Sequence, residues 1–195
     1  MTLAQSIMVK LGSQMPEFHL KDVTTGKLVS FEDFEENEAM LIMFMCQHCP
    51  YVQHIAEEIS QIAKDYAKKG VGIVAICSND IENYPDDAPE NLRDMAEEYD
   101  FTFPFLHDDS QEVAADFAAA CTPDFFLYDE DRKLVYRGQL DDSRPENGKP
   151  VTGKDLREAL EKVLSGRAIP ESQKPSSGCS IKWKAGNEPI YSSEK

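Results

Sequence analysis

Residues 40–50 of the chain read Met-Leu-Ile-Met-Phe-Met-Cys-Gln-His-Cys-Pro, and this stretch decides the fold. Its apolar first half, Met40 to Met45, has the length of a strand that is buried on both faces, as in the middle of a parallel sheet. Pro50 suits the first turn of a helix, because its missing N–H group would have no partner there. The stretch therefore predicts a strand, a turn that carries two cysteines, and the start of a helix.

The residues after Pro50 complete a β-α-β unit. Apolar side chains recur there at the three- and four-residue spacing of an amphipathic helix: Val52, Ile55, Ala56, Ile59, Ile62, Ala63 and Tyr66. Gly70 ends this helix, and the apolar run Val71–Cys77 predicts a second buried strand. The cysteine pair Cys46 and Cys49 is therefore expected at the turn between a strand and a helix.

The remaining patterns predict an α/β domain whose central mixed sheet is flanked by helices. Short strands are expected over residues 18–20, 28–30, 102–106, 125–128 and 134–136, of which the first two form an N-terminal hairpin. Further helices are expected around residues 92–99, 113–117 and 152–164. We expect residues 1–165 to form this domain and residues 166–195 to form an extension that packs on it or is partly disordered. The apolar anchors of a packed extension would be Ile181, Trp183, Ile190 and Tyr191.

The chain has 195 residues, and its 36 acidic and 20 basic side chains give a formal charge of −16. Such an acidic body repels nucleic-acid backbones and anionic membrane surfaces, so neither is an expected partner. No apolar run approaches the ~18 residues of a membrane-spanning helix. The first ten residues lack the basic and apolar regions of a secretory signal. We therefore expect a cytoplasmic protein.

Five cysteines are spread along the chain: Cys46, Cys49, Cys77, Cys121 and Cys179. An odd number without a secretory signal argues against a disulfide scaffold. Only Cys46 and Cys49 are close in sequence, and two thiols three positions apart on the first turn of a helix can close a disulfide. The N–H groups and the dipole at the start of a helix stabilise a thiolate. We expect Cys46 to be the more exposed, attacking thiol and Cys49 to be the resolving thiol.

His48 lies between the two cysteines, and its imidazolium is expected to lower the pKa of Cys46. The spacing of the pair also occurs in zinc sites, but these use about four ligands. The other histidines are scattered along the chain: His19, His54 and His107. We therefore expect neither a metal nor a cofactor, while metal binding and inert core thiols remain as alternatives. Cys77 ends an apolar strand and is interpreted as a buried structural thiol.

Two segments resemble the thioredoxin-fold family. One is the strand, cysteine pair and helix of residues 40–66, and the other is Cys-Thr-Pro-Asp-Phe-Phe-Leu-Tyr at residues 121–128, which is similar to the loop and strand that carry a cis-proline opposite the dithiol. The resemblance implies that Pro123 is this cis-proline and that the backbone of Thr122 pairs with a bound substrate. It also places Cys121 near the dithiol, where a redox role is possible.

The resemblance covers about residues 14–165 and is closest to the redoxin branch, which includes peroxiredoxins and membrane-linked thioredoxin-like reductases. Residues 178–184, Gly-Cys-Ser-Ile-Lys-Trp-Lys, resemble a peroxiredoxin-like subgroup of that branch. Within the extension, Cys179 is close enough along the chain to reach the dithiol. We nevertheless expect its replacement to leave catalysis largely intact.

Several positions depart from the patterns of these families. Met40 stands where thioredoxins have a buried Asp, which leaves the proton acceptor for Cys49 open, and Met45 replaces a Trp. In the peroxiredoxin pattern Pro-x-x-x-Thr-x-x-Cys, Cys49 fits the last position. However, Ile42 and Cys46 stand at the Pro and Thr positions, so the peroxide-binding hydroxyl is missing.

Together these features predict a thioredoxin-like thiol–disulfide oxidoreductase with five candidate site residues: Cys46, Cys49, His48, Thr122 and Pro123. Its partners would be protein or small-molecule disulfides or dithiols, together with an upstream thiol reductant. Two alternatives stay open. One is a peroxiredoxin-like thiol peroxidase with antioxidant activity, for which Arg144 is a candidate for the late arginine of that family. The other is a non-enzymatic redox-sensing or metal-binding module.

Overall fold

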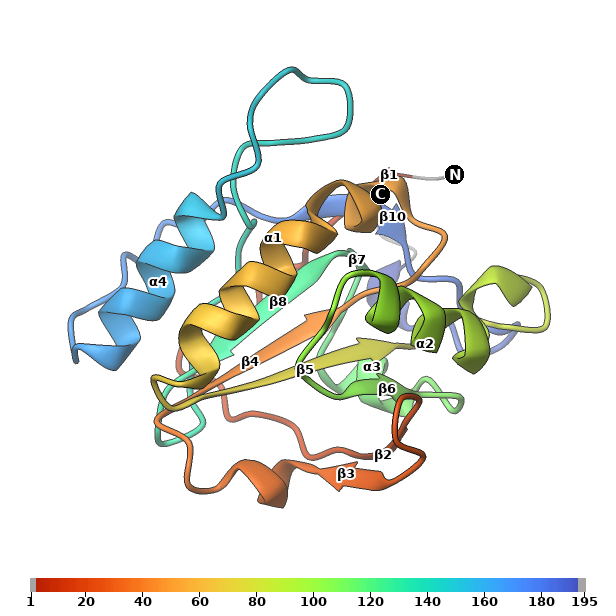
Figure 1. Cartoon of the computed structure of the whole chain (residues 1–195), viewed down its shortest axis with the longest axis horizontal. Helices are drawn as coiled ribbons and strands as arrows, with labels where there is room; N and C mark the ends of the chain where they lie inside the picture. The colour runs from red at the N-terminus through yellow and green to blue at the C-terminus, as the bar shows by residue number, and fades with distance from the viewer. Residues whose placement is uncertain (1–2, 193–195) are drawn as a thin grey trace.

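Strand β4 (Ala39–Phe44) forms the middle of the fold in a computed structural model that describes residues 3–192. All of its residues are buried. It pairs in parallel with β5 (Val71–Cys77) and antiparallel with β8 (Asp124–Tyr128). Helix α1 (Pro50–Ala67) connects β4 to β5, so the predicted β-α-β unit is confirmed (Figure 1).

The central sheet of the described residues has seven strands in the order β3-β2-β6-β5-β4-β8-β9. Its remaining strands are β2 (His19–Asp22), β3 (Leu28–Ser30), β6 (Phe105–His107) and β9 (Leu134–Tyr136). Strands β4, β5 and β6 run in parallel, whereas β2 pairs antiparallel with β3 and β6, and β8 pairs antiparallel with β9. The predicted mixed sheet and both hairpins are therefore confirmed, with shifts of a few residues at some strand ends.

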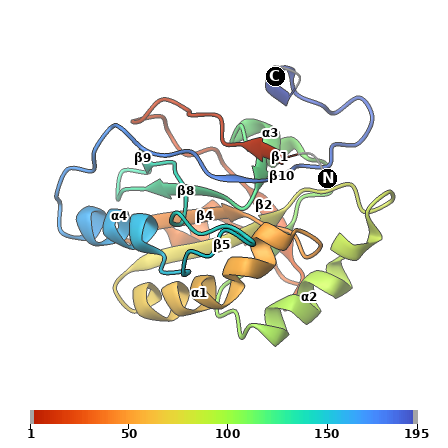
Figure 2. The same cartoon turned by 90° about the horizontal axis from the view of Figure 1, so that it is seen from above.

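Helices cover both faces of this sheet. They are α1, α2 (Pro89–Glu98), α3 (Glu112–Asp116) and α4 (Lys154–Leu164), with short 3₁₀ turns η1 (Phe31–Phe34), η2 (Pro85–Asp87) and η3 (Ile190–Ser192). Figure 2 shows α1, α2 and α4 on one face of the sheet and α3 on the other. Among residues 3–192, no helix is both long enough and apolar enough to cross a membrane.

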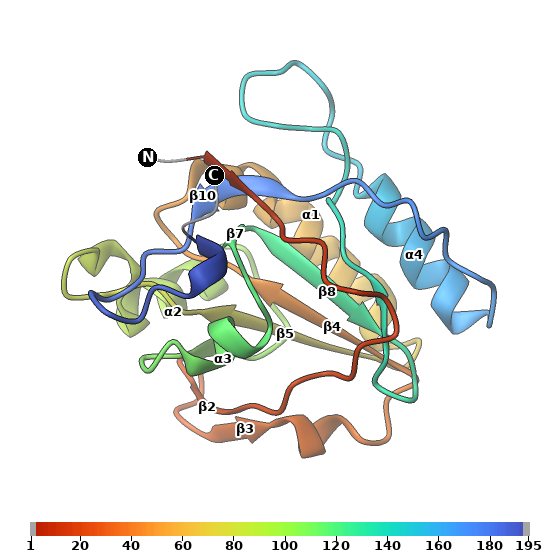
Figure 3. The same cartoon turned by 180° about the vertical axis from the view of Figure 1, so that it is seen from behind.

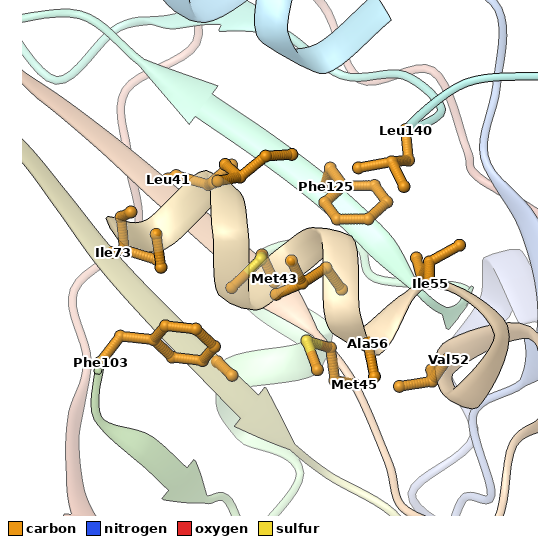
Figure 4. Packing of buried hydrophobic residues seen from close by; sticks show 14 of the residues in the cluster. Leu41, Met43, Met45, Val52, Ile55, Ala56, Ile73, Phe103, Phe125 and Leu140 are labelled. Carbon is orange, nitrogen blue, oxygen red and sulfur yellow. The ribbon is translucent and has the colours of Figure 1, made fainter. Parts of the chain in front are cut away.

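The side chains of β4 alternate between two buried clusters, one on each face of the sheet. Leu41 and Met43 belong to the cluster under α1, which Figure 4 shows together with Val52 and Ala56 of the helix. The alternate residues of the strand, such as Ile42, pack on the opposite face. Because a strand places successive side chains on opposite faces, one apolar hexamer supplies both cores. This double burial fixes the end of β4 and therefore the position of the cysteine turn.

A second, smaller sheet lies at one end of the central sheet, and the sequence patterns did not predict it. Its antiparallel strands follow the order β1 (Leu3–Gln5), β10 (Ser177–Ser180) and β7 (Cys121–Thr122). Figure 3 shows β1 and β10 side by side close to β7. The C-terminal extension thus reaches the cysteine turn. Ile181 is buried, but the expectation that Ile190 anchors the extension is wrong, because this side chain is 85% exposed.

Candidate active site

The two cysteines of the pair lie at the end of β4 and the start of α1. Cys49 is the N-cap residue of α1, and Pro50 follows in the first turn as predicted. Both cysteines have a relative exposure of 0%. The expectation that Cys46 is the more exposed thiol is therefore wrong. It fails because the turn is covered by chain segments that are distant in sequence, which the spacing of the pair cannot show.

The first covering segment is the loop between β7 and β8. The peptide bond between Thr122 and Pro123 is cis, as the family resemblance implied. The Thr122 hydroxyl lies 3.2 Å from Cys46 Sγ, and the Thr122 carbonyl oxygen lies 3.2 Å from Cys49 Sγ. The structure thus brings together Cys46, Cys49, Thr122 and Pro123, which are four of the five candidate site residues.

The second covering segment is β10 of the C-terminal extension. Its Cys179 is the antiparallel partner of Thr122. The Sγ atom of Cys179 lies 2.8 Å from Cys49 Sγ, and Cys179 is itself buried. The backbone edge of Thr122 that the resemblance assigns to a substrate is therefore occupied by the chain's own strand. The sequence showed that Cys179 could reach the pair but gave no signal that it makes this contact.

The surroundings of the two thiols shift their pKa values in opposite directions. Burial raises the pKa of Cys46 well above its ordinary value, and the negative charge of Asp87 adds to this effect. Hydrogen bonds with Cys179 and Cys46 lower the pKa of Cys49. While β10 covers the turn, these pKa shifts therefore favour the negative charge at Cys49. This contrasts with the expectation that His48 would favour a thiolate at Cys46.

His48 points toward a carboxylate. Its Nδ1 atom lies 2.5 Å from Oδ2 of Asp87, and its ring stacks on Tyr84 with the ring centroids 5.7 Å apart. The hydrogen bond with Asp87 raises the pKa of His48, so the imidazolium is favoured. The imidazolium is therefore paired with Asp87 and not with a Cys46 thiolate, the partner that the sequence predicted.

Asp87 organises the cysteine turn and is the site residue that sequence reasoning missed. Its Oδ1 atom accepts hydrogen bonds from the backbone N–H groups of Gln47 (2.8 Å) and His48 (3.0 Å), and Asn79 donates to its Oδ2 atom (2.8 Å). Burial opposes the charge of Asp87, but the hydrogen bonds from His48 and Asn79 outweigh it and lower the pKa. The residue lies in an acid-rich stretch, residues 80–100, where nothing in the sequence distinguishes one carboxylate from the others.

The other candidates occupy less central positions. Cys77 ends β5 and is buried, and burial raises its pKa, which agrees with a structural thiol. Cys121 is also buried, and its Sγ atom lies 3.6 Å from the carbonyl oxygen of Pro123. Arg144 donates to the carbonyl oxygens of Asp141 and Ser143 at 2.7 and 2.6 Å. It also donates to Oε1 of Gln139 at 2.7 Å, so its guanidinium is engaged within its own loop, and its assignment as the late arginine of a peroxidase stays a prediction.

One group of three metal-ligating side chains stands out among the described residues. One ligand atom each of Cys46, His48 and Asp87 lie within 4.8 Å of one another. Structural zinc sites use about four ligands. Within this group the Nδ1 atom of His48 is already engaged by Asp87. Two of the three ligands therefore already pair with each other, as part of the hydrogen bonds with which Asp87 supports the turn.

A mixed sheet with a cysteine pair at the start of a helix, opposite a cis-proline loop, defines a thioredoxin-like protein. Residues 10–156 match the family model described as Redoxin, and the chain belongs to this family. A search of curated proteins found no match.

Solved structures share this fold. An uncharacterized conserved protein from Geobacillus kaustophilus is 55% identical with a TM-score of 0.92, over 94% of this chain and 97% of that one. A hypothetical protein from Sinorhizobium meliloti is 46% identical with a TM-score of 0.91, over 93% and 99%. The thioredoxin domain of a thiol-disulfide oxidoreductase from Bacteroides vulgatus is 21% identical with a TM-score of 0.62, over 80% and 99%, and shares the fold.

Proposed function

We propose that this chain is a thiol–disulfide oxidoreductase whose reactive pair is Cys46 and Cys49. The observation that carries the proposal is the contact of both sulfur atoms with Thr122, at 3.2 Å each, on the strand edge where a substrate chain would pair. Membership of the Redoxin family supports an oxidoreductase. The substrates would be protein or small-molecule disulfides or dithiols, and an upstream thiol would reduce the pair again.

The exchange takes place in two steps. The Cys46 thiolate attacks one sulfur of the substrate disulfide, which forms a mixed disulfide and releases the other substrate sulfur as a thiolate that takes up a proton. The Cys49 thiolate then attacks Cys46, which closes the Cys46–Cys49 disulfide and releases the second substrate thiol. The same steps in reverse oxidise a dithiol.

The strand β10 must leave Thr122 before a substrate chain can pair there. Its departure removes Cys179, whose hydrogen bond is the largest cause of the lowered pKa of Cys49. The hydrogen bonds of Cys49 with Cys46 and Thr122, which also lower this pKa, do not depend on β10. We place the first attack at Cys46 once β10 has left, as the sequence analysis predicts.

The test uses a generic protein disulfide, insulin, as substrate. We expect Cys49→Ser to accumulate a mixed disulfide through Cys46, because the resolving thiol is missing, and Cys46→Ser to lose turnover. Cys77→Ser removes a buried thiol outside the pair and serves as the matched control. Turnover that persists in both pair variants would contradict the proposal, and a trapped adduct on Cys49 alone would reverse the order of attack.

A thiol peroxidase is the second candidate, and the lowered pKa of Cys49 is the observation that favours it. Peroxide reacts with a thiolate, and Cys49 stands at the cysteine position of the peroxiredoxin pattern. The missing hydroxyl at the Cys46 position argues against efficient catalysis. Rapid peroxide consumption that survives Cys46→Ser but not Cys49→Ser would establish this activity in place of disulfide exchange.

A further inference from the structure

The dithiol has a third thiol as its direct neighbour. Cys49 Sγ lies 2.8 Å from Cys179 Sγ, although the two residues are 130 positions apart in the chain. A disulfide bond is about 2.05 Å long, so a relative movement of less than about 1 Å would join these two sulfur atoms. Contacts between distant cysteines at this distance need both backbones to be held in place.

The extension is held in place on both sides of Cys179. Ahead of it, the Ser176 hydroxyl donates to the carbonyl oxygen of Pro123 at 2.7 Å, and the Ser6 backbone N–H donates to the Ser176 carbonyl at 3.0 Å. Beyond it, the backbone N–H of Lys182 donates to Oδ1 of Asn79 at 2.8 Å. Cys179 is thus fixed within a strand whose hydrogen bonds continue on both sides of it.

The residue before Cys179 has to be small for this arrangement to exist. A Cβ atom on Gly178 would lie 2.0 Å from the carbonyl oxygen of Thr122 and 3.1 Å from Cδ of Pro123. Glycine therefore permits β10 to lie against the cis-proline loop more closely than any other residue would allow. This close approach is what carries the Cys179 sulfur to Cys49.

We propose that Cys179 is a third redox-active thiol of this site, and that oxidation of the dithiol is passed on to a Cys49–Cys179 disulfide. The inference rests on the proposed function for the source of the oxidised pair. Cys49 is the common member of both disulfides, because it contacts Cys179 directly and lies three positions from Cys46.

The exchange step is balanced without an external oxidant. The hydrogen bond with Cys49 is the largest cause of the raised pKa of Cys179 in the reduced chain, and it is lost once Cys49 is bonded to Cys46. In this oxidised chain, the Cys179 thiolate attacks Cys49 Sγ of the Cys46–Cys49 disulfide. The bond between Cys49 and Cys179 forms, the bond between Cys46 and Cys49 breaks, and Cys46 leaves as a thiolate that takes up the proton lost by Cys179. One disulfide replaces another, so no electrons are gained or lost. The product ties β10 covalently to Cys49, so that the strand stays paired with Thr122, and it leaves the Cys46 thiol reduced.

The test removes Cys46 so that only Cys179 can resolve an adduct on Cys49. The Cys46→Ser protein is treated with 5,5′-dithiobis(2-nitrobenzoate), an aromatic disulfide that releases one coloured thiol for each sulfur bond exchanged. We expect release of two equivalents per chain, the first from attack by Cys49 and the second when Cys179 displaces the bound half. Peptide mapping without reduction is expected to show Cys49 joined to Cys179.

Two double variants serve as controls. Cys46→Ser with Cys179→Ser is expected to release one equivalent and to retain the adduct on Cys49, whereas Cys46→Ser with Cys121→Ser is expected to behave like Cys46→Ser alone. Release of one equivalent or none by Cys46→Ser, or an adduct on Cys49 beside an alkylatable Cys179, would overturn the inference. Failure of the proposed function would appear separately, as wild-type protein that does not reduce insulin, whatever the stoichiometry of Cys46→Ser.

Discussion

Gly178 lies so close to Thr122 that a Cβ atom on the glycine would meet the threonine carbonyl oxygen at 2.0 Å. The two residues belong to the neighbouring strands β10 and β7, where Cys179 is the register partner of Thr122. Backbone atoms on the Thr122 side cannot move aside as a flexible side chain would. Access to the dithiol therefore depends on whether β10 is paired with the edge of β7.

Replacing Gly178 by valine is expected to detach β10 from β7 and to expose the two thiols of the pair. Overpacking of this kind costs ~1–3 kcal/mol, which corresponds to roughly 5- to 160-fold more of the open form, in which β10 has left β7. Alkylation of Cys46 and Cys49 in the native protein, followed over time by peptide mass spectrometry, should accelerate by a factor in this range.

Ser172→Val is the matched control for this experiment. Ser172 lies in the same extension but is exposed, so valine there meets no neighbouring backbone. Its alkylation rate should equal that of the wild type. Equal rates in Gly178→Val and wild type would show that β10 does not limit access to the thiols.

A buried ion pair supports the loop on its other side. Arg137 and Asp124 are both fully buried, their side chains lie 3.0 Å apart, and Asp124 directly follows Pro123. Arg137→Met leaves an uncompensated charge on Asp124, and such a loss costs ~3–5 kcal/mol. Urea denaturation should show a decrease of this size in the free energy of unfolding.

The exposed pair of Lys69 and Glu161, with atoms 2.8 Å apart, provides the comparison. Exposed pairs contribute only ~0–1 kcal/mol, so Lys69→Met should cost no more than this. If both methionine variants lose the same stability, burial is not what makes the Arg137 pair important.

The sequence predicted the central sheet well because its strands carry local signals. The apolar hexamer that begins at Met40 can only be buried on both faces, and the helix after Pro50 follows from spacing alone. The strand β10 has no such signal, since Ser177–Ser180 contains no β-branched or aromatic residue. It forms because β1 and β7 provide partners from distant parts of the chain.

The same difference between local signals and long-range contacts explains which site residues the sequence identified. Cys46, Cys49 and Pro123 stand in recognisable motifs and were found by them. Asp87 and Cys179 were not, because one is a single acid in an acidic stretch and the other an isolated cysteine in an irregular extension. Their importance arises from hydrogen bonds and contacts across the fold, which also explains why the predicted exposure of Cys46 was wrong.

Cys121 and Cys77 are expected to stay reduced when the dithiol is oxidised. Burial raises the pKa of both thiols and so disfavours the thiolate that attacks a disulfide, and the Sγ atom of Cys121 contacts the carbonyl oxygen of Pro123. After treatment with excess oxidised glutathione, unfolding and alkylation should label these two cysteines completely. Loss of label at Cys121 would instead assign it the redox role that its place near Pro123 left open.

The ion pair of His48 and Asp87 predicts a specific pH dependence of stability. The hydrogen bond with Asp87 raises the pKa of His48 in the folded protein above its unfolded value of about 6.5. A group with a raised folded pKa contributes its full stability below the unfolded pKa and loses it as the pH rises through the folded pKa.

The free energy of unfolding, measured with urea from below pH 6.5 upward, should therefore fall more steeply in wild type than in His48→Gln. His19→Gln, at an exposed histidine, should retain the wild-type slope. Parallel curves for wild type and His48→Gln would show that the pair does not keep the imidazolium charged in the folded protein.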